Sequence, residues 1–183
     1  DAEFGGTLGI GGTIAASAVT GGLQLRRGEI SIFDRRIAFR RGTMACTGIQ
    51  FCKLAFVDTK SDAATLIDDL EERLADLDLG DTQLSINLNG CPNSCARIQV
   101  ADIGLKGQII GGEFGYQVHL GGGLADAPHR EEGELGRTVR GLRITTAELA
   151  DWTERIIRRY AADRNDAETF AEWAHRADEE ALQ

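Results

Sequence analysis

The chain has 183 residues, with 20 Lys and Arg against 29 Asp and Glu, which gives a formal net charge of −9. This length suits one domain or slightly more and allows a substantial core. The acidic balance argues against nucleic acid as the main partner, and no stretch approaches the ~20 apolar residues of a membrane-spanning helix. No export signal is recognisable, so we expect a cytoplasmic protein with no membrane partner.

The N-terminal segment, residues 1–39, is rich in Gly and Ala and differs in composition from residues 40–183, which we take as the main domain. The run Gly9–Gly12 is similar to a phosphate-binding turn, but Ile14 stands where a dinucleotide fingerprint needs its third glycine. A flexible linker or an irregular hairpin is the better interpretation. Charge is also uneven: residues 1–60 carry +3 and the remainder carries −12.

The middle of the chain predicts one helix followed by strands. Leucines at helical spacing predict a helix over residues 62–77, with Ser61 as its N-cap. Apolar residues that alternate with polar ones predict strands over residues 83–88, 98–103 and 116–120, separated by glycine-rich turns.

Two helices are predicted at the C-terminal end. The first begins near Thr145, with Glu148 completing a capping box, and the second begins near Asn165, with Glu168 in the same relative position. Each helix carries one tryptophan on its apolar stripe, which favours core packing for both. The order of elements predicts an α+β fold, with helices packed against a mixed or antiparallel sheet.

The four cysteines stand in two close pairs. Five residues separate Cys46 from Cys52, and three separate Cys91 from Cys95. Small and turn-forming residues around both pairs let thiolates converge and leave backbone N–H groups free to bond sulfur. Structural zinc sites usually pair their ligands as C-x2–4-C, which fits the second pair and not the first. The pattern favours a 4Fe-4S cluster and leaves zinc open, whereas disulfides need an oxidising compartment.

The sequence around these cysteines resembles the ferredoxin-dependent nitrite and sulfite reductases. Residues 43–55, TMACTGIQFCKLA, are similar to the first cluster motif of that family, and residues 89–97, NGCPNSCAR, to the second. Residues 99–104 and 118–123 match as well, so the resemblance extends from about residue 40 to the C-terminus. Paired motifs of this kind are far more specific than a lone C-x-x-C.

The resemblance implies a 4Fe-4S cluster on Cys46, Cys52, Cys91 and Cys95, with Cys95 also bridging to the iron of siroheme, the family's second cofactor. It implies six-electron reduction of nitrite to ammonia or of sulfite to sulfide, usually with ferredoxin as electron donor. The sequence of residues 47–52 is more similar to the nitrite-reducing members of the family.

The same resemblance suggests further contacts with siroheme. Four residues are candidates: Ala45, Thr47, Asn93 and Arg97. A turn residue bonded to its own backbone is the alternative for Asn93, and a surface charge is the alternative for Arg97. Arg40 and Arg41 precede the first motif and are candidates for contact with a siroheme carboxylate or an acidic ferredoxin. We expect His119 to be buried and hydrogen-bonded and not to be a metal ligand.

The resemblance covers only the second of the family's two related halves. The basic residues that grip the substrate belong largely to the first half, so the missing N-terminal half is an expected partner, without which we expect the chain to be inactive. The first alternative is a non-catalytic iron–sulfur electron-transfer module that has lost the first half. The second alternative is a zinc-stabilised structural domain.

Overall fold

A computed structural model of the chain describes residues 42–77, 84–124 and 133–183 with their side chains. Of residues 1–41 it describes the backbone of four strands. The chain divides into two compact units, residues 1–40 and residues 41–183. In the described part, no helix is both long enough and apolar enough to cross a membrane.

The first unit contains two antiparallel strand pairs. The longer pair is a hairpin, β1 (Glu3–Thr13) with β2 (Ala16–Arg27), whose register shifts once near its open end. The shorter pair is β3 (Ile30–Ile32) with β4 (Arg35–Ile37). An irregular hairpin is therefore the correct interpretation of the glycine-rich segment.

The second unit is built on a mixed five-stranded sheet in the order β5-β6-β7-β8-β9. The first three strands run parallel to one another, and the last two are antiparallel to their neighbours. This arrangement confirms the predicted α+β class with a mixed sheet. The strand bounds are β5 Thr43–Ala45, β6 Ile86–Asn89, β7 Ile103–Ile110, β8 Glu113–Leu120 and β9 Arg137–Thr145.

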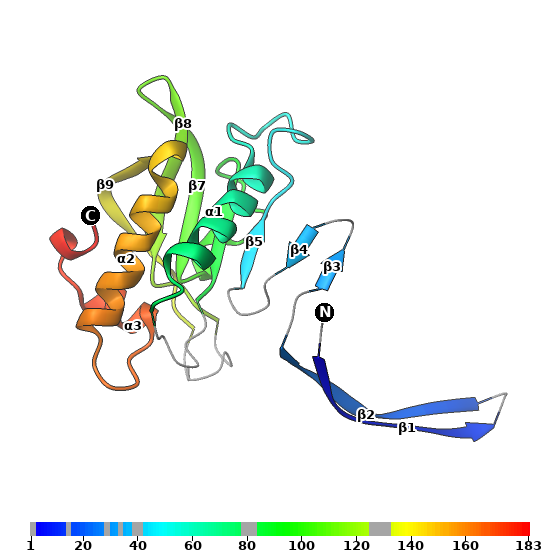
Figure 1. Ribbon diagram of the computed structural model, residues 1–183. Coiled ribbons are helices and arrows are strands. Elements are labelled where there is room, and N and C mark those ends of the chain that lie inside the picture. The colour runs from blue at the N-terminus through cyan, green and yellow to red at the C-terminus, as the bar shows by residue number, and fades with distance from the viewer. Residues whose placement is uncertain are drawn as a thin grey trace. The chain divides into compact units, whose positions relative to one another are not determined.

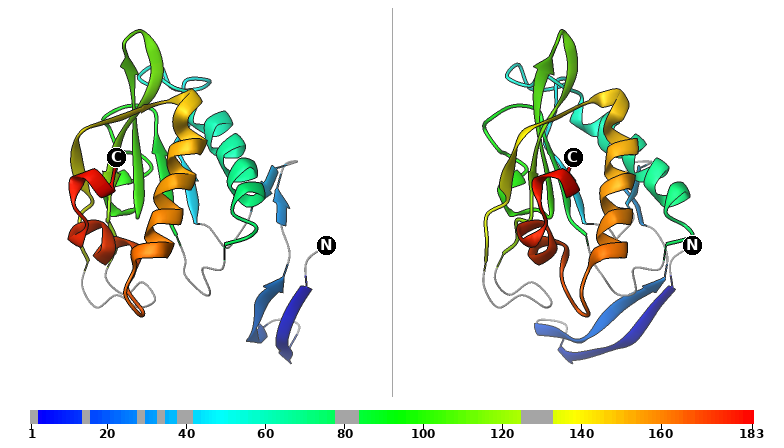
Figure 2. Two further views of the ribbon diagram at one scale, coloured as in Figure 1. Left: turned by 60° about the vertical axis from the view of Figure 1, so that its left-hand side comes forward. Right: turned by 90° about the vertical axis from the view of Figure 1, so that its left-hand side faces the viewer.

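Two long helices, α1 (Thr59–Arg73) and α2 (Leu149–Asp163), lie side by side on one face of this sheet (Figures 1 and 2). A short helix, α3 (Phe170–Arg176), follows α2. Single 3-10 turns lie before β7, before α2 and after α3, at η2 (Ile98–Val100), η3 (Thr146–Glu148) and η4 (Glu179–Ala181). The core between helices and sheet includes Trp152, Trp173 and Tyr160, all at most 2% exposed. Both tryptophans are thus core residues, as predicted.

Helix α1 begins and ends earlier than the leucine spacing predicts. Its N-cap is Asp58, whose side chain accepts hydrogen bonds from the backbone and hydroxyl of Ser61. Ser61 was the wrong choice because a carboxylate three residues before it satisfies the free N–H groups of the first turn. The helix ends at Arg73, although Leu74 continues its buried stripe.

Two other predicted elements were misplaced. Residues 98–100 form a 3-10 turn, and the strand begins only at Ile103. Glu168 does accept the N–H of Asn165, but α3 begins later, behind a second capping box of Thr169 and Glu172. The predicted strand over residues 116–120 lies within β8, and the predicted start at Thr145 has its capping box with Glu148.

Candidate functional site

The first cysteine pair lies on the loop that leaves β5. Cys46 follows the strand directly, and its N–H donates to the carbonyl of Leu88 on the neighbouring strand at 2.9 Å. The loop then turns on Gly48, whose carbonyl accepts the N–H of Cys52 at 2.9 Å. Gly48 has a positive φ of 71°, a conformation that glycine adopts without strain. The turn is therefore held by backbone bonds.

The second pair lies on the loop that leaves β6, with Cys91 two residues beyond the strand. Asn89, which is completely buried, organises this loop with both ends of its amide. Its oxygen accepts the N–H of Ala96 at 2.6 Å, and its nitrogen donates to the carbonyl of Cys91 at 3.2 Å. Ser94 and Arg97 both have positive φ values close to Cys95, so the amide holds the backbone in a conformation that non-glycine residues rarely adopt.

The two loops meet because β5 and β6 are parallel neighbours. Ala45 pairs with Leu88 in the sheet, so the residues that follow each strand emerge at the same edge. The contact is direct: the N–H of Gly90 donates to the sulfur of Cys46 at 3.1 Å. The carbonyl of Gly90 in turn accepts the N–H of Phe56 at 2.7 Å. One residue of the second loop is thus bonded to both ends of the first.

The four cysteines are free thiols that differ in exposure. Cys91 is buried, Cys46 and Cys52 are half-buried, and Cys95 is exposed. The described residues contain no group of three or more His, Cys, Asp and Glu placed to hold one metal ion. A zinc site needs its ligands around one ion, whereas in a 4Fe-4S cluster each thiolate meets a different iron. A donor set of four thiolates on two adjoining loops, with an N–H aimed at sulfur, fits such a cluster.

The residues predicted to contact siroheme fall in two environments. Ala45 is half-buried at the end of β5, packed against the core. Thr47, Asn93 and Arg97 are exposed on the two cysteine loops. Their positions place all four on the same edge of the sheet as the cysteines. Arg40 and Arg41 lie outside the described residues.

His119 lies on β8 and is hydrogen-bonded as expected, but it is half-buried and not fully buried. Its Nδ1 lies 2.9 Å from the hydroxyl of Thr138 on the next strand. Burial, and secondarily the nearby charge of Lys106, hold the pKa of His119 below its ordinary value, so it is neutral at pH 7. Its Nε2 is buried and has no partner among the described residues.

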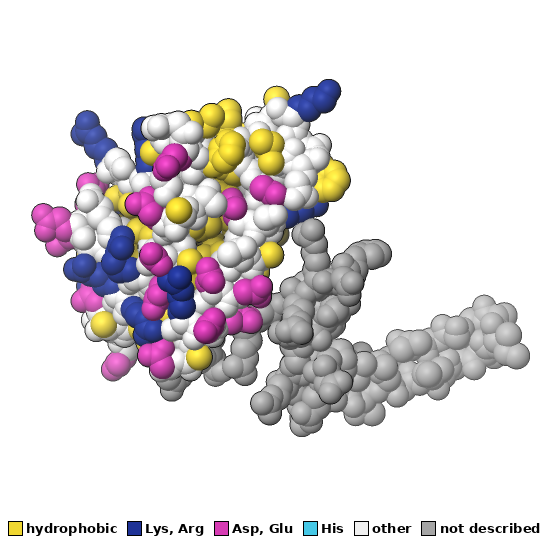
Figure 3. Space-filling view, turned by 45° about the horizontal axis from the view of Figure 1, so that its top comes forward, with side chains coloured by type: hydrophobic (Ala, Val, Ile, Leu, Met, Phe, Trp, Pro, Cys, Tyr) yellow, Lys and Arg dark blue, Asp and Glu magenta, His cyan; other side chains and the backbone are white. Residues whose placement is uncertain are grey.

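An apolar surface adjoins the first cysteine loop. The exposed large hydrophobic residues there include Phe51 and Leu54, and three others line a pocket of about 420 Å³: Ile49, Phe56 and Phe114. Hydrophobic side chains gather at this end of the molecule in Figure 3. Asp62, which lines the pocket, accepts a hydrogen bond from the hydroxyl of Tyr116 at 2.5 Å. Burial raises the pKa of the Asp62 carboxyl. Sequence reasoning missed this pair because nothing in the spacing of residues 62 and 116 connects them.

A mixed sheet with four thiols on the loops at the carboxyl ends of two parallel strands is the arrangement expected of an iron–sulfur protein. The model of the nitrite and sulphite reductase 4Fe-4S domain matches residues 37–183. The chain belongs to that family.

Several known proteins are similar to the chain. It is 53% identical over 155 residues to sulfite reductase (ferredoxin) 1 of Mycolicibacterium paratuberculosis, covering 81% of this chain and 27% of the relative. It is 34% identical over 137 residues to the sulfite reductase (NADPH) hemoprotein beta-component of Chromohalobacter salexigens, covering 75% of this chain and 22% of the relative. The chain therefore spans about a quarter of the length of these curated relatives.

Solved structures agree with this assignment. The Mycobacterium tuberculosis NirA protein superposes with a TM-score of 0.71 at 46% identity, covering 79% of this chain and 27% of that one. Dissimilatory sulfite reductase I superposes with a TM-score of 0.55 at 14% identity, covering 76% of this chain and 50% of that one, which shows a shared fold alone.

Proposed function

We propose that this chain is the cluster-holding part of a sulfite reductase, with Cys46, Cys52, Cys91 and Cys95 as ligands of a 4Fe-4S cluster. The observation that carries the proposal is the pairing of β5 with β6, which brings both cysteine motifs to one edge of the sheet. When bound, the cluster and siroheme would supply carriers that pass electrons one at a time to the substrate.

The chain's own residues have two tasks in this proposal. The first is to fix four thiolates, which Asn89 and Gly90 accomplish through the bonds that shape and join the loops. The second is to leave one thiolate open to a second cofactor. Cys95 is the exposed member of the four, which supports its proposed role as the ligand shared with siroheme iron. Ala45, Thr47, Asn93 and Arg97 are proposed to border that cofactor.

For the substrate we propose sulfite, reduced to sulfide by six electrons. The relatives compared above are named as sulfite reductases, and the sequence-based preference for nitrite stays a prediction with no support among those names. The proposed electron donor is a ferredoxin, after the name of the first of these relatives. An acidic ferredoxin is repelled by the −12 portion of the chain, so we propose docking near the more basic residues 1–60 or on the N-terminal half of the enzyme.

Metal analysis of the anaerobically purified chain tests the proposal. We expect about four iron and four acid-labile sulfide per chain, with a brown colour and broad visible absorption. Zinc at about one per chain without colour would establish the structural alternative instead. An iron–sulfur chain that shows no sulfite turnover with a strong reductant, siroheme and the N-terminal half supplied would identify an electron-transfer module.

Two substitutions distinguish a proposed cluster ligand from a residue proposed to border siroheme. Cys91→Ser should abolish the iron and sulfide content, because a buried serine hydroxyl does not replace a thiolate. Asn93→Ala on the same loop should keep the cluster and weaken siroheme retention, measured by its absorption after reconstitution with the N-terminal half. Equal iron content in Cys91→Ser and the unmodified chain would contradict the ligand assignment.

A further inference from the structure

Thr59 is a completely buried polar residue next to the first cysteine loop. It is the first residue of α1, so the helix that crosses from β5 to β6 begins against that loop. Its hydroxyl donates to the carbonyl of Cys46 at 2.9 Å and lies 3.6 Å from the sulfur of the same residue. One side chain thus touches both the backbone and the thiol of one predicted ligand.

In the contact between Thr59 and the sulfur of Cys46, a ligated thiolate leaves only the hydroxyl as a possible donor. A thiolate bound to iron carries no proton and can only accept, whereas the hydroxyl of Thr59 is both donor and acceptor. Its single proton goes to the carbonyl of Cys46 at 2.9 Å in this structure, and the sulfur, 3.6 Å away, is the second acceptor to which the hydroxyl can turn. The N–H of Gly90 donates to the same sulfur at 3.1 Å, so this N–H and, after its proton turns, the Thr59 hydroxyl are the two groups able to donate to it.

The backbone of the loop is shaped to admit this hydroxyl. A Cβ on Gly48 would lie 2.7 Å from the Thr59 oxygen and 3.0 Å from its backbone nitrogen. The first distance is shorter than real Cβ contacts and the second is tighter than most of them, so glycine lets the loop approach the helix this closely. Gly48 serves both the positive φ of the turn and the contact with Thr59.

We propose that Thr59 is a positioning residue for Cys46, which fixes the thiol toward the cluster and raises the reduction potential of the cluster. A hydrogen-bond donor beside a ligand sulfur stabilises the more negative reduced state, and such bonds are among the determinants of cluster potentials. The expected effect on the reduction potential rests on the proposed function, because it needs a bound cluster. The expected effect on the orientation of Cys46 does not, because it needs only the chain.

The full 183-residue chain with Thr59→Val tests the inference, because valine keeps the shape of threonine and removes the hydroxyl. We expect a more negative potential in a redox titration followed by electron paramagnetic resonance, and a changed signal of the reduced cluster. Thr59→Ser retains the donor and should restore both. Thr153→Val is the matched control: Thr153 is equally buried and its hydroxyl donates to the carbonyl of Leu149 at 2.7 Å, on α2.

A second readout needs no cluster. In the reduced metal-free chain, iodoacetamide labelling of Cys46, normalised to exposed Cys95 by mass spectrometry, measures how often the loop opens. Thr59→Val should raise this ratio about fivefold, because loss of one neutral hydrogen bond increases the population of the open loop by about that factor. Thr153→Val should leave the ratio unchanged.

Gly48→Ala perturbs the same contact from the other side and decides the question if Thr59→Val does not fold. Its control is Gly141→Ala, because Gly141 has a similar φ of 79° and open space around its Cβ position. Labelling that rises with Gly48→Ala and not with Gly141→Ala supports the inference. An iron-free purified chain would refute the proposed function and leave the labelling test to decide the orientation of Cys46. An unchanged potential and unchanged labelling in Thr59→Val would refute the inference and leave the cluster assignment intact.

Discussion

Gly90, on the second cysteine loop, packs closely against the first. A Cβ there would lie 2.6 Å from the side chain and 3.3 Å from the backbone of Ala55, on the first loop. Gly90→Ala should therefore separate the loops, lower the free energy of unfolding by about 1–3 kcal/mol and reduce iron content. Thermal unfolding and iron analysis measure the two effects.

Gly42→Ala is the matched control for that substitution. A Cβ on Gly42 would have its nearest neighbours at 3.7 Å, an ordinary van der Waals distance. We expect this variant to keep its iron and its unfolding temperature. Equal behaviour of the two variants would mean that the close approach at Gly90 does not matter to the site.

Residue types and their spacing indicated the candidate ligands, and geometry was needed for what surrounds them. The spacing of the cysteines and the residues between them indicated a cluster and the four atoms that would bind it. The roles of Asn89 and Thr59 were not visible, because each is a common residue whose partner is a backbone group on a loop that folding brings near. Sequence periodicity reports which face of an element is buried and not which backbone atom a buried amide meets.

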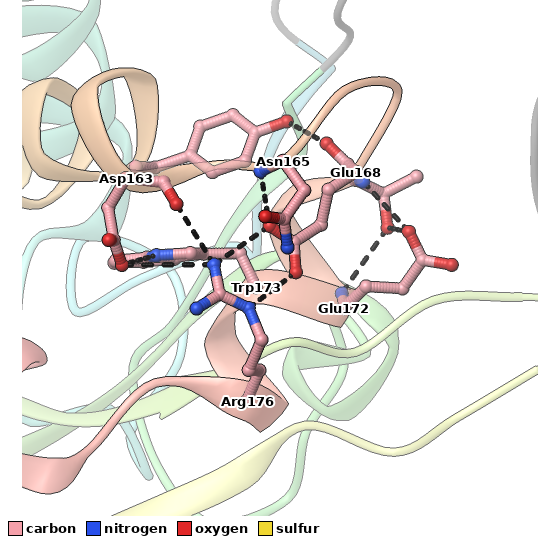
Figure 4. A network of polar contacts seen from close by, with 8 residues as sticks. Asp163, Asn165, Glu168, Glu172, Trp173 and Arg176 are labelled. Carbon is pink, nitrogen blue, oxygen red and sulfur yellow. Dashed lines mark hydrogen bonds and ion pairs between the residues drawn. The ribbon is translucent and has the colours of Figure 1, made fainter.

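At the scale of elements, the carboxylate of Glu168 links the segment between α2 and α3 to Arg176 on α3. Glu168 accepts the N–H of Asn165 at 2.8 Å and two bonds from the guanidinium of Arg176, at 2.7 and 2.9 Å (Figure 4). The guanidinium of Arg176 holds the pKa of Glu168 below its usual range. A carboxyl with a lowered pKa stabilises the fold above its unfolded pKa and loses that contribution as pH falls through its folded pKa.

Acid titration of unfolding measures this contribution. The unfolding temperature should fall as pH is lowered from 7 toward ~3, and part of that fall should be missing in Glu168→Gln, because glutamine does not titrate. Glu180→Gln, at an exposed position in η4, should keep the slope of the unmodified chain. A slope identical in all three chains would show that Glu168 does not stabilise the C-terminal helices.

Element types were predicted better than element boundaries, for a local reason. The helix that begins at Thr59 is preceded by an Asp that competes with Ser61 as N-cap, and both residue types are good caps. Residues 98–100 alternate in polarity like a strand, yet they follow Arg97 with its positive φ and form a turn. Such choices depend on backbone conformation outside the segment, so local patterns do not decide them.

At the scale of the molecule, residues 41–183 contain a complete core. Among the described residues, the buried hydrophobic cluster extends from Val57 to Leu182. We therefore expect a chain lacking residues 1–40 to fold with an unchanged unfolding temperature, measured by circular dichroism. A large loss of stability would show that the N-terminal unit supplies part of the folding free energy.

The parallel pairing of β5 and β6 also has a mechanical consequence. A cluster spanning both loops would tie the chain before α1 to the chain after β6, closing a ring that contains the whole crossover. Like a disulfide, such a tie restricts the unfolded chain more than the folded one. Loss of the cluster and opening of this ring would then be one event. In a single-molecule pulling experiment, the metal-loaded chain should therefore extend by less than the metal-free chain before the cluster is lost.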